Sequence, residues 1–225
     1  MLLLFDIDGT LLLKASLEHV AAMHAALRDV HGVTEPARVE AAGRTDVEIA
    51  RQICVLAGVP AADFDARLDE LLDAVAVQYA ELVPDDISAR VAPGIPELLE
   101  ALHARDDALL SLVTGNIEPV ARMKLRSAGI GHRFPGGQGG FGSDHEDRTY
   151  LPAVARARAG ADGTPHPRAD TLVIGDTPRD IACAHADGVR CIAVASGPYP
   201  EEELGDADVV VPDARSLLGA IDSLV

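Results

Sequence analysis

The first ten residues, Met1-Leu2-Leu3-Leu4-Phe5-Asp6-Ile7-Asp8-Gly9-Thr10, decide how the rest of the sequence is interpreted. Leu2–Phe5 is a short apolar run, typical of a buried strand in a parallel sheet. Alternation along an extended backbone puts Asp6 and Asp8 on the same side of the chain, just past the strand. Gly9 then permits a sharp turn. Ligands bind at this end of open parallel sheets, so the stretch predicts both a strand and a site.

Further apolar runs bounded by polar or turn residues predict more buried strands. They are Ala108–Val113, Thr171–Ile174, Cys191–Ala195 and the shorter Asp208–Val211. Helical stretches separate them. This alternation predicts an α/β protein with a doubly wound, Rossmann-like parallel sheet.

Residues 15–88 interrupt the alternation, because they carry helical spacing and no strand pattern. Leu17–Val30 and Phe64–Tyr79 are two such helical stretches. Between them, Thr45-Asp46-Val47-Glu48 has the pattern of a capping box that opens a helix running to about Ala57. We therefore expect an all-helical cap at 15–88, inserted into an α/β core of 1–14 and 89–225.

The composition excludes several classes of protein. Hydrophobic residues make up 48% of the 225 residues, which is too many for a disordered chain. The formal net charge of −17 disfavours nucleic-acid binding. No apolar run is long enough to span a bilayer, and the opening stretch is too short and too acidic for a signal peptide. The three scattered cysteines are expected to be reduced, which predicts a cytoplasmic location. Monomer and homodimer are both open.

The pair Asp6 and Asp8 is the strongest chemical signal. Two carboxylates about 4 Å apart repel by about 4 kcal/mol at an effective dielectric constant near 20. A bound cation or a proton relieves this repulsion. The pair therefore predicts a nucleophile and a proton shuttle beside a divalent metal. The alternative is a polar turn that ends the strand.

A second signal, Ile174-Gly175-Asp176-Thr177-Pro178-Arg179-Asp180, also follows an apolar run. Asp176 is expected just past the strand end, with Asp180 one helical turn further. An oxygen-rich group of Asp6, Asp8 and Asp176 suits a hard ion such as Mg²⁺. The alternative for Asp176 is a helix N-cap.

A third signal, Thr114-Gly115-Asn116, offers a hydroxyl and backbone N–H groups at the start of a helix, which is a pattern for anion binding. A phosphoryl group among several carboxylates also needs a cation besides Mg²⁺. Lys124, in the following helix, and Arg148, in a loop-rich stretch, compete for this role. The compact charge of Lys124 favours it, because the fork of Arg148 better suits a substrate oxygen.

In this order the motifs resemble those of the haloacid dehalogenase superfamily. The matching residues are Asp6 and Asp8, Thr114, Lys124 or Arg148, and Asp176 with Asp180. The resemblance covers the predicted core, and the helical insert is similar to the first cap type of that family. One departure is that many relatives carry a Lys-Pro pair where this chain has Asp147-Arg148-Thr149.

The resemblance implies a role for each matching residue. Asp6 is expected to form an aspartyl-phosphate, and Asp8 to act as a general acid and base with a raised pKa. Thr114 is expected to bind a phosphoryl oxygen, and Lys124 to neutralise the charge, steadied by Asp180. Mg²⁺ is expected to be held by Asp6, the backbone carbonyl of Asp8, and Asp176.

Several details favour one chemistry within that family. Asp8 argues against a dehalogenase, and Lys14 is the only lysine near the cap, which argues against a Schiff-base phosphonate hydrolase. Thr10 leans towards a phosphatase rather than a sugar phosphomutase. The overall likeness is to phosphoglycolate-phosphatase-like enzymes acting on a small phosphorylated metabolite. The alternatives are a sugar phosphomutase and a catalytically inert binding module.

The cap is expected to choose the substrate. In Gly43-Arg44-Thr45-Asp46, Arg44 is a candidate for binding a substrate carboxylate or phosphate; the alternative is a solvated side chain beside a helix cap. His19 and His24 either face the cleft or pack within the cap. The glycine-rich stretch Gly136–Gly142 is expected to be a mobile loop beside the site, since it lacks the ending of a phosphate-binding loop.

Overall fold

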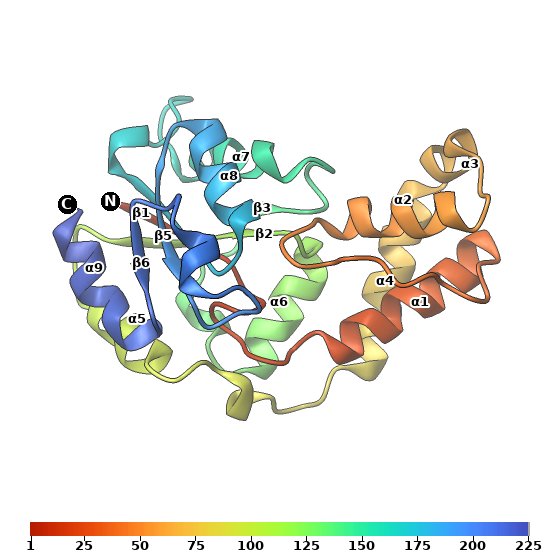
Figure 1. Ribbon diagram of the computed structural model, residues 1–225, viewed down its shortest axis with the longest axis horizontal. Helices are drawn as coiled ribbons and strands as arrows, with labels where there is room; N and C mark the ends of the chain where they lie inside the picture. Colours follow the sequence, from red (N-terminus) through yellow and green to blue (C-terminus); the bar gives the residue numbers. More distant parts are fainter. Residues whose placement is uncertain (225) are drawn as a thin grey trace.

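The computed structural model describes residues 1–224, and within them six parallel strands form one sheet in the order β3-β2-β1-β4-β5-β6 (Figure 1). The strands are β1 (Leu2–Phe5), β2 (Leu109–Thr114), β3 (Gly140–Phe141), β4 (Thr171–Gly175), β5 (Arg190–Val194) and β6 (Val209–Val211). This is the strand order of a Rossmann-like doubly wound sheet, so the predicted fold class is confirmed.

Helices cover both faces of the sheet, which explains why the strands are apolar without alternation. Leu3 and Phe5 of β1 belong to the hydrophobic cluster that includes α5 (Ile95–His103), α6 (Glu118–Ser127) and α9 (Leu217–Ser223). Leu2 and Leu4 belong to the opposite cluster, with α7 (Leu151–Ala159) and α8 (Pro178–Asp187).

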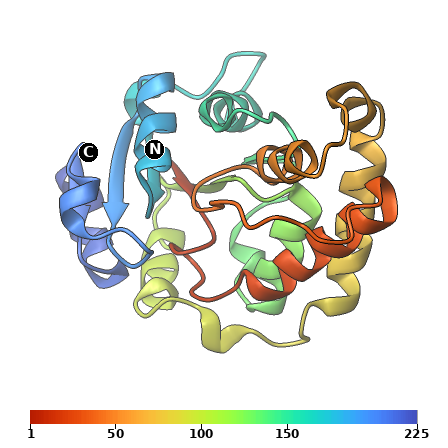
Figure 2. The same cartoon turned by 45° about the vertical axis from the view of Figure 1, so that its right-hand side comes forward.

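Four helices follow β1 and lie to one side of the sheet, as Figures 1 and 2 show. They are α1 (Leu17–His31), α2 (Asp46–Leu56), α3 (Ala61–Ala66) and α4 (Leu68–Leu82). They share their own hydrophobic cluster, around buried side chains such as Leu27 and Tyr79. Ile117 and Val120, at the start of α6, join that cluster and seat the four helices against the core.

Three local expectations were wrong or only half right. Gly140 and Phe141, expected in a mobile loop, form the edge strand β3, which pairs with Val113 and Thr114 of β2. The predicted helix from Phe64 to Tyr79 is divided at Arg67 into α3 and α4. Thr45 does cap α2 by accepting from the Glu48 N–H, but the Glu48 carboxylate pairs with Arg44 and does not complete the capping box.

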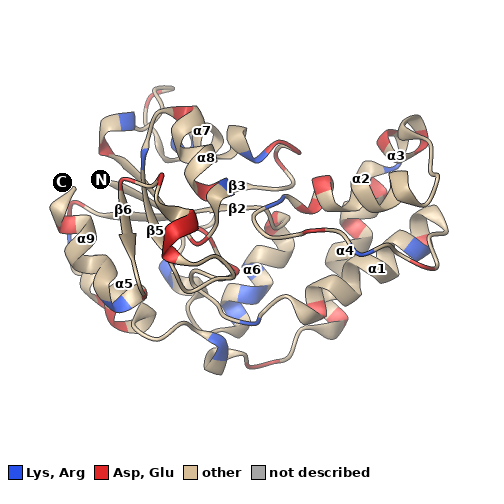
Figure 3. Cartoon of the chain, viewed as in Figure 1, with Lys and Arg blue, Asp and Glu red and all other residues tan. Residues whose placement is uncertain are grey.

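Charge is spread over the whole described molecule. In the view of Figure 3 basic segments are dispersed among acidic ones on both the sheet and the helical insert. Across residues 1–224, no helix combines the length and the apolar character that a membrane crossing requires.

Candidate active site

Three strands deliver the predicted residues to one edge of the sheet. β1 ends before Asp6 and Asp8, its neighbour β2 ends at Thr114, and its other neighbour β4 ends before Asp176. Because the strands are parallel, their carboxyl ends lie together, where ligands bind in such sheets. Asp180 joins them as the N3 residue of α8, where Thr177 and Asp180 form a complete capping box.

Asp6 lies in a buried acidic group with Asp176 and Asp180. One ligand atom from each of these carboxylates lies within 4.8 Å of the others. Burial raises the pKa of Asp6, although the Arg148 guanidinium opposes it. Burial, followed by the charges of Asp180 and Asp6, raises the pKa of Asp176. Full ionisation of the three carboxylates is therefore unfavourable without a further cation, and a proton or a bound metal ion relieves it.

Arg148 is the cation on this side of the site. Its Nη2 lies 3.1 Å from Asp6 Oδ1 and also contacts Asp180 Oδ1. The residue sits in a short 3₁₀ helix (Arg148–Tyr150) after β3, and Asp147 caps that helix by accepting from the Thr149 N–H. The unexpected strand β3 thus brings Arg148 to the strand ends.

The donor set of this acidic group suits Mg²⁺. Carboxylate oxygens are the ligands that a small hard ion prefers. Asp176 Oδ2 is buried and has no hydrogen-bond partner among residues 1–224. Its other oxygen, Oδ1, accepts from Thr10 at 3.0 Å, a contact that sequence reasoning missed. Asp180 is already bound by Arg148 and Thr177, so Asp6 and Asp176 are the side chains best placed to hold the ion.

Asp8 lies in a separate setting and does not join the acidic group. Its Oδ2 accepts from Lys124 Nζ at 2.6 Å and from Asn116 Nδ2 at 2.8 Å. Its Oδ1 has no partner among the described residues. Burial alone would raise the pKa of Asp8, but the Lys124 ammonium outweighs it and the pKa is lowered. The expected raised pKa is therefore wrong for Asp8 in this structure.

Lys124 is fully buried and lies against Asp8 rather than Asp6. Long side chains on a helix lean towards its N-terminus, so the ammonium on α6 reaches back to the strand ends. Its expected support from Asp180 is wrong, because Asp180 pairs with Arg148. Lys124 instead contacts Asn116 Oδ1 at 2.7 Å and His19 Nδ1 at 3.3 Å.

The Thr114-Gly115-Asn116 turn packs against the helical insert. Thr114 is fully buried, and its hydroxyl accepts from Asn116 Nδ2 at 2.9 Å. The Gly115 carbonyl accepts from the Asp46 N–H at 2.8 Å. A Cβ at Gly115 would lie 1.9 Å from the Arg44 carbonyl oxygen, so only glycine permits this approach.

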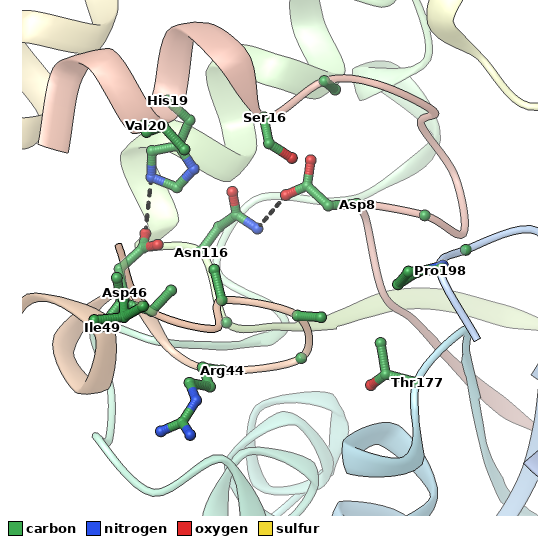
Figure 4. Close-up of a pocket in the computed structure, with 18 of the residues that line it drawn as sticks. Asp8, Ser16, His19, Val20, Arg44, Asp46, Ile49, Asn116, Thr177 and Pro198 are labelled. Atoms are coloured by element: carbon green, nitrogen blue, oxygen red, sulfur yellow. Dashed lines mark hydrogen bonds and ion pairs between the residues drawn. The ribbon is translucent and has the colours of Figure 1, made fainter. Parts of the chain in front are cut away.

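A cavity of about 740 Å³ opens beside these residues and is lined by both the core and the helical insert. Asp6, Asp8 and Asp176 line it from the core. His19, His24 and Arg44 are among its walls on the other side. Arg44 donates to Glu48, its neighbour one helical turn on, and Figure 4 shows it away from Asp8.

The fold and the paired carboxylates agree with one family. A model of the haloacid dehalogenase-like hydrolases matches residues 3–185, and the chain belongs to this family. The resemblance predicted from the motifs is thereby confirmed.

Particular relatives extend the comparison over the whole chain. The chain is 26% identical to "Probable phosphatase IndB" of Dickeya dadantii, over 100% of this chain and 94% of that protein. A β-phosphoglucomutase from Clostridium difficile has a similar fold, with a TM-score of 0.73 and 16% identity over 99% of this chain and 95% of that one. A predicted phosphoglycolate phosphatase from Haemophilus somnus has a TM-score of 0.66 and 21% identity, over 98% and 97% of the two chains.

Proposed function

We propose that this hydrolase is a Mg²⁺-dependent phosphatase that cleaves a small phosphate monoester through an aspartyl-phosphate on Asp6. One observation carries the proposal. Only Ile7 separates Asp6 from Asp8 in the sequence, yet Asp6 lies in an acidic group that suits a metal. Asp8 has one oxygen, Oδ2, that is bound by Lys124 and another, Oδ1, that has no hydrogen-bond partner among the described residues. This division suits a nucleophile and a proton shuttle.

Asp6 and Asp176 would hold Mg²⁺, with the backbone carbonyl of Asp8 as the family resemblance implies. The ion would supply positive charge to the transferring phosphoryl group. Arg148, whose Nη2 lies 3.1 Å from Asp6 Oδ1, supplies further positive charge. We thus assign to Arg148 the role that the sequence favoured for Lys124.

The reaction proceeds in two displacements. An Asp6 carboxylate oxygen attacks phosphorus, the bond from phosphorus to the leaving oxygen breaks, and Asp8 gives a proton to that oxygen. Water then attacks the phosphorus of the aspartyl-phosphate, its proton passes to Asp8, and the bond from phosphorus to Asp6 breaks to release phosphate. Thr114 is fully buried at the end of β2, and its hydroxyl accepts from Asn116. Any effect of Thr114 on the substrate is therefore transmitted through Asn116.

The contact with Lys124 favours ionised Asp8, which suits the second displacement. The first displacement needs a protonated Asp8. We expect the negative charge of the bound phosphoryl group to raise the pKa of Asp8, since like charge disfavours ionisation.

The relatives support a small phosphorylated metabolite as substrate, with phosphoglycolate the first to test. The cavity is large enough for a sugar phosphate, which favours a sugar phosphomutase as the second candidate. Three free, buried cysteines, Cys54, Cys183 and Cys191, support the expected cytoplasmic location.

The test is phosphate release from a panel of phosphate monoesters that includes phosphoglycolate and hexose phosphates. Each ester is assayed with Mg²⁺ or EDTA, with the isosteric variant Asp6→Asn as the control. We expect release that requires Mg²⁺ and is lost in Asp6→Asn. Isomerisation of a hexose phosphate without net release would favour the mutase, and folded protein inactive on every ester would favour the inert binding module.

A further inference from the structure

A buried chain of polar contacts joins the helical insert to Asp8. His19, on α1, lies between Lys124 and Asp46: its Nδ1 is 3.3 Å from Lys124 Nζ, and its Nε2 is 3.1 Å from Asp46 Oδ2. His19 is 8% exposed and Asp46 is 5% exposed. Figure 4 shows His19 facing Asp46 and Asn116 facing Asp8. The chain of contacts thus runs from α1 and α2 into the core.

The contacts of Lys124 favour one role for each nitrogen of His19. The Lys124 ammonium has three N–H donors, and three acceptors surround it: Asp8 Oδ2, Asn116 Oδ1 and His19 Nδ1. All three donors are satisfied only if Nδ1 carries no proton. The ring proton of a neutral His19 then lies on Nε2, which is 3.1 Å from Asp46 Oδ2 without forming a hydrogen bond with good geometry.

Two further contacts hold the His19 ring in place. Asp46 Oδ2 accepts from the Ile117 N–H at 2.7 Å, which ties it to the start of α6. The rings of His19 and Tyr79 pack in a T-shaped arrangement, with the ring centroids 5.7 Å apart. His19 therefore presents its acceptor to Lys124 from a rigid position, as long as α1 lies against α6.

We propose that His19 is a positioning residue for Asp8, acting through the ammonium of Lys124; this inference rests on the proposed function. Without His19, the buried ammonium loses one of its three acceptors and its place against Asp8 Oδ2 is no longer fixed. Asp8 Oδ1 is the oxygen left free for proton transfer. Misplacing a catalytic group by about 1 Å can cost on the order of 100-fold in rate.

Two variants of similar size separate positioning from packing. His19→Asn keeps a polar acceptor near the place of Nδ1, and His19→Leu fills the space without one. His31→Ala is the control, because His31 is on the same helix but stacks on Phe64 and does not line the cavity. Thermal unfolding of all three variants shows which of them fold.

The kinetic measurement compares an alkyl phosphate with an aryl phosphate whose leaving group needs little protonation. For the alkyl ester, His19→Leu is expected to lower kcat by about 10- to 100-fold with little change in KM. The loss in kcat is expected to be smaller for the aryl ester, and His19→Asn is expected to keep most of the activity of the unsubstituted protein. Equal losses for both esters, or equal losses in the Leu and Asn variants, would overturn the inference.

Crystal structures of the two variants keep the inference separate from the proposed function. If no ester gives Asp6-dependent release, the proposed function fails, but the position of Asp8 remains measurable. We expect Lys124 and Asp8 to shift in His19→Leu and to keep their places in His19→Asn. An unmoved Asp8 in the folded His19→Leu protein would overturn the inference even if the enzyme is active.

Discussion

Asp6 and Asp8 are neighbours in sequence, but the two sides of the site treat their carboxylates in opposite ways. On the Asp6 side, Arg148 pairs with two of three buried carboxylates, Asp6 and Asp180, and burial raises the pKa of Asp6. On the Asp8 side, one carboxylate has Lys124 to itself, and its pKa is lowered. Each side has its own cation, so the nucleophile and the proton shuttle face different positive charges, although the charge of Asp8 also contributes to the raised pKa of Asp6.

The largest expected effect comes from removing the two cations in turn. Arg148→Met would leave Asp6 and Asp180 without a cation in a buried place, and breaking such a pair costs about 3–5 kcal/mol. Lys124→Met would cost less, because the Asp8 side chain is 26% exposed whereas Asp180 is fully buried. Urea unfolding in EDTA measures both free energies.

The charge-conserving variants Arg148→Lys and Lys124→Arg are the controls. Arg148→Lys is expected to recover part of the stability, since an ammonium cannot span Asp6 and Asp180 as a guanidinium does. Arg148→Met should also lose activity with every ester. If Lys124→Met proves the more destabilising change, the proposed division of the two cations is wrong.

The raised pKa values on the Asp6 side predict how stability depends on pH and on Mg²⁺. The pKa values of Asp6 and Asp176 rise from an ordinary 3.8 to about 7 and about 9. Without metal, the native state therefore binds more protons than the unfolded chain, so stability is present at low pH and is lost as pH rises through these values. Mg²⁺ binds the ionised carboxylates and offsets the loss.

We therefore expect the Tm in EDTA to fall between pH 6 and pH 9, and Mg²⁺ to raise the Tm more at pH 9 than at pH 6. A stability change of 1 kcal/mol corresponds to about 2–4 °C in a chain of this size. Asp176→Asn removes one of the two titrating groups and is expected to flatten both trends. An Mg²⁺ effect of equal size at both pH values would contradict the assignment of the ion to Asp6 and Asp176.

The sequence predicted the places of those site residues that directly follow strongly apolar strands. Leu2–Phe5 and Thr171–Ile174 are apolar enough to identify two strands, and the ends of those strands place Asp6, Asp8 and Asp176. Strand β3 has only two residues, one of them glycine, and no periodicity could reveal it. Because β3 determines where Arg148 lies, the sequence offered Arg148 only as an alternative to Lys124 and could not choose it as the cation beside Asp6. His19 has ordinary helical spacing, so only the packing of α1 against α6 reveals its contact with Lys124.

The smallest expected effects come from two threonine caps, one on each side of the comparison. Thr177 holds Asp180 at the start of α8, and Thr45 holds the start of α2, where Asp46 lies. Thr177→Ala and Thr45→Ala should each cost about 1 kcal/mol, because each removes a side-chain cap. The matched variants Thr177→Ser and Thr45→Ser keep the hydroxyl and should cost less.

The two threonine caps support different residues, so the two variants test the Asp6 side and the Asp8 side separately. The Thr177 hydroxyl donates to Asp180 Oδ2, so its loss should loosen the Asp180–Arg148 pair beside Asp6 and thereby weaken the apparent affinity for Mg²⁺. The Thr45 hydroxyl donates to the Glu146 carbonyl across to the core, so its loss should loosen α2 and affect kcat through Asp46 and His19. Titration of Mg²⁺ activation in both alanine variants measures the difference. Equal changes in Mg²⁺ affinity would mean that the two sides of the site are not independent, since a cap on the Asp8 side would then act on the acidic group around Asp6.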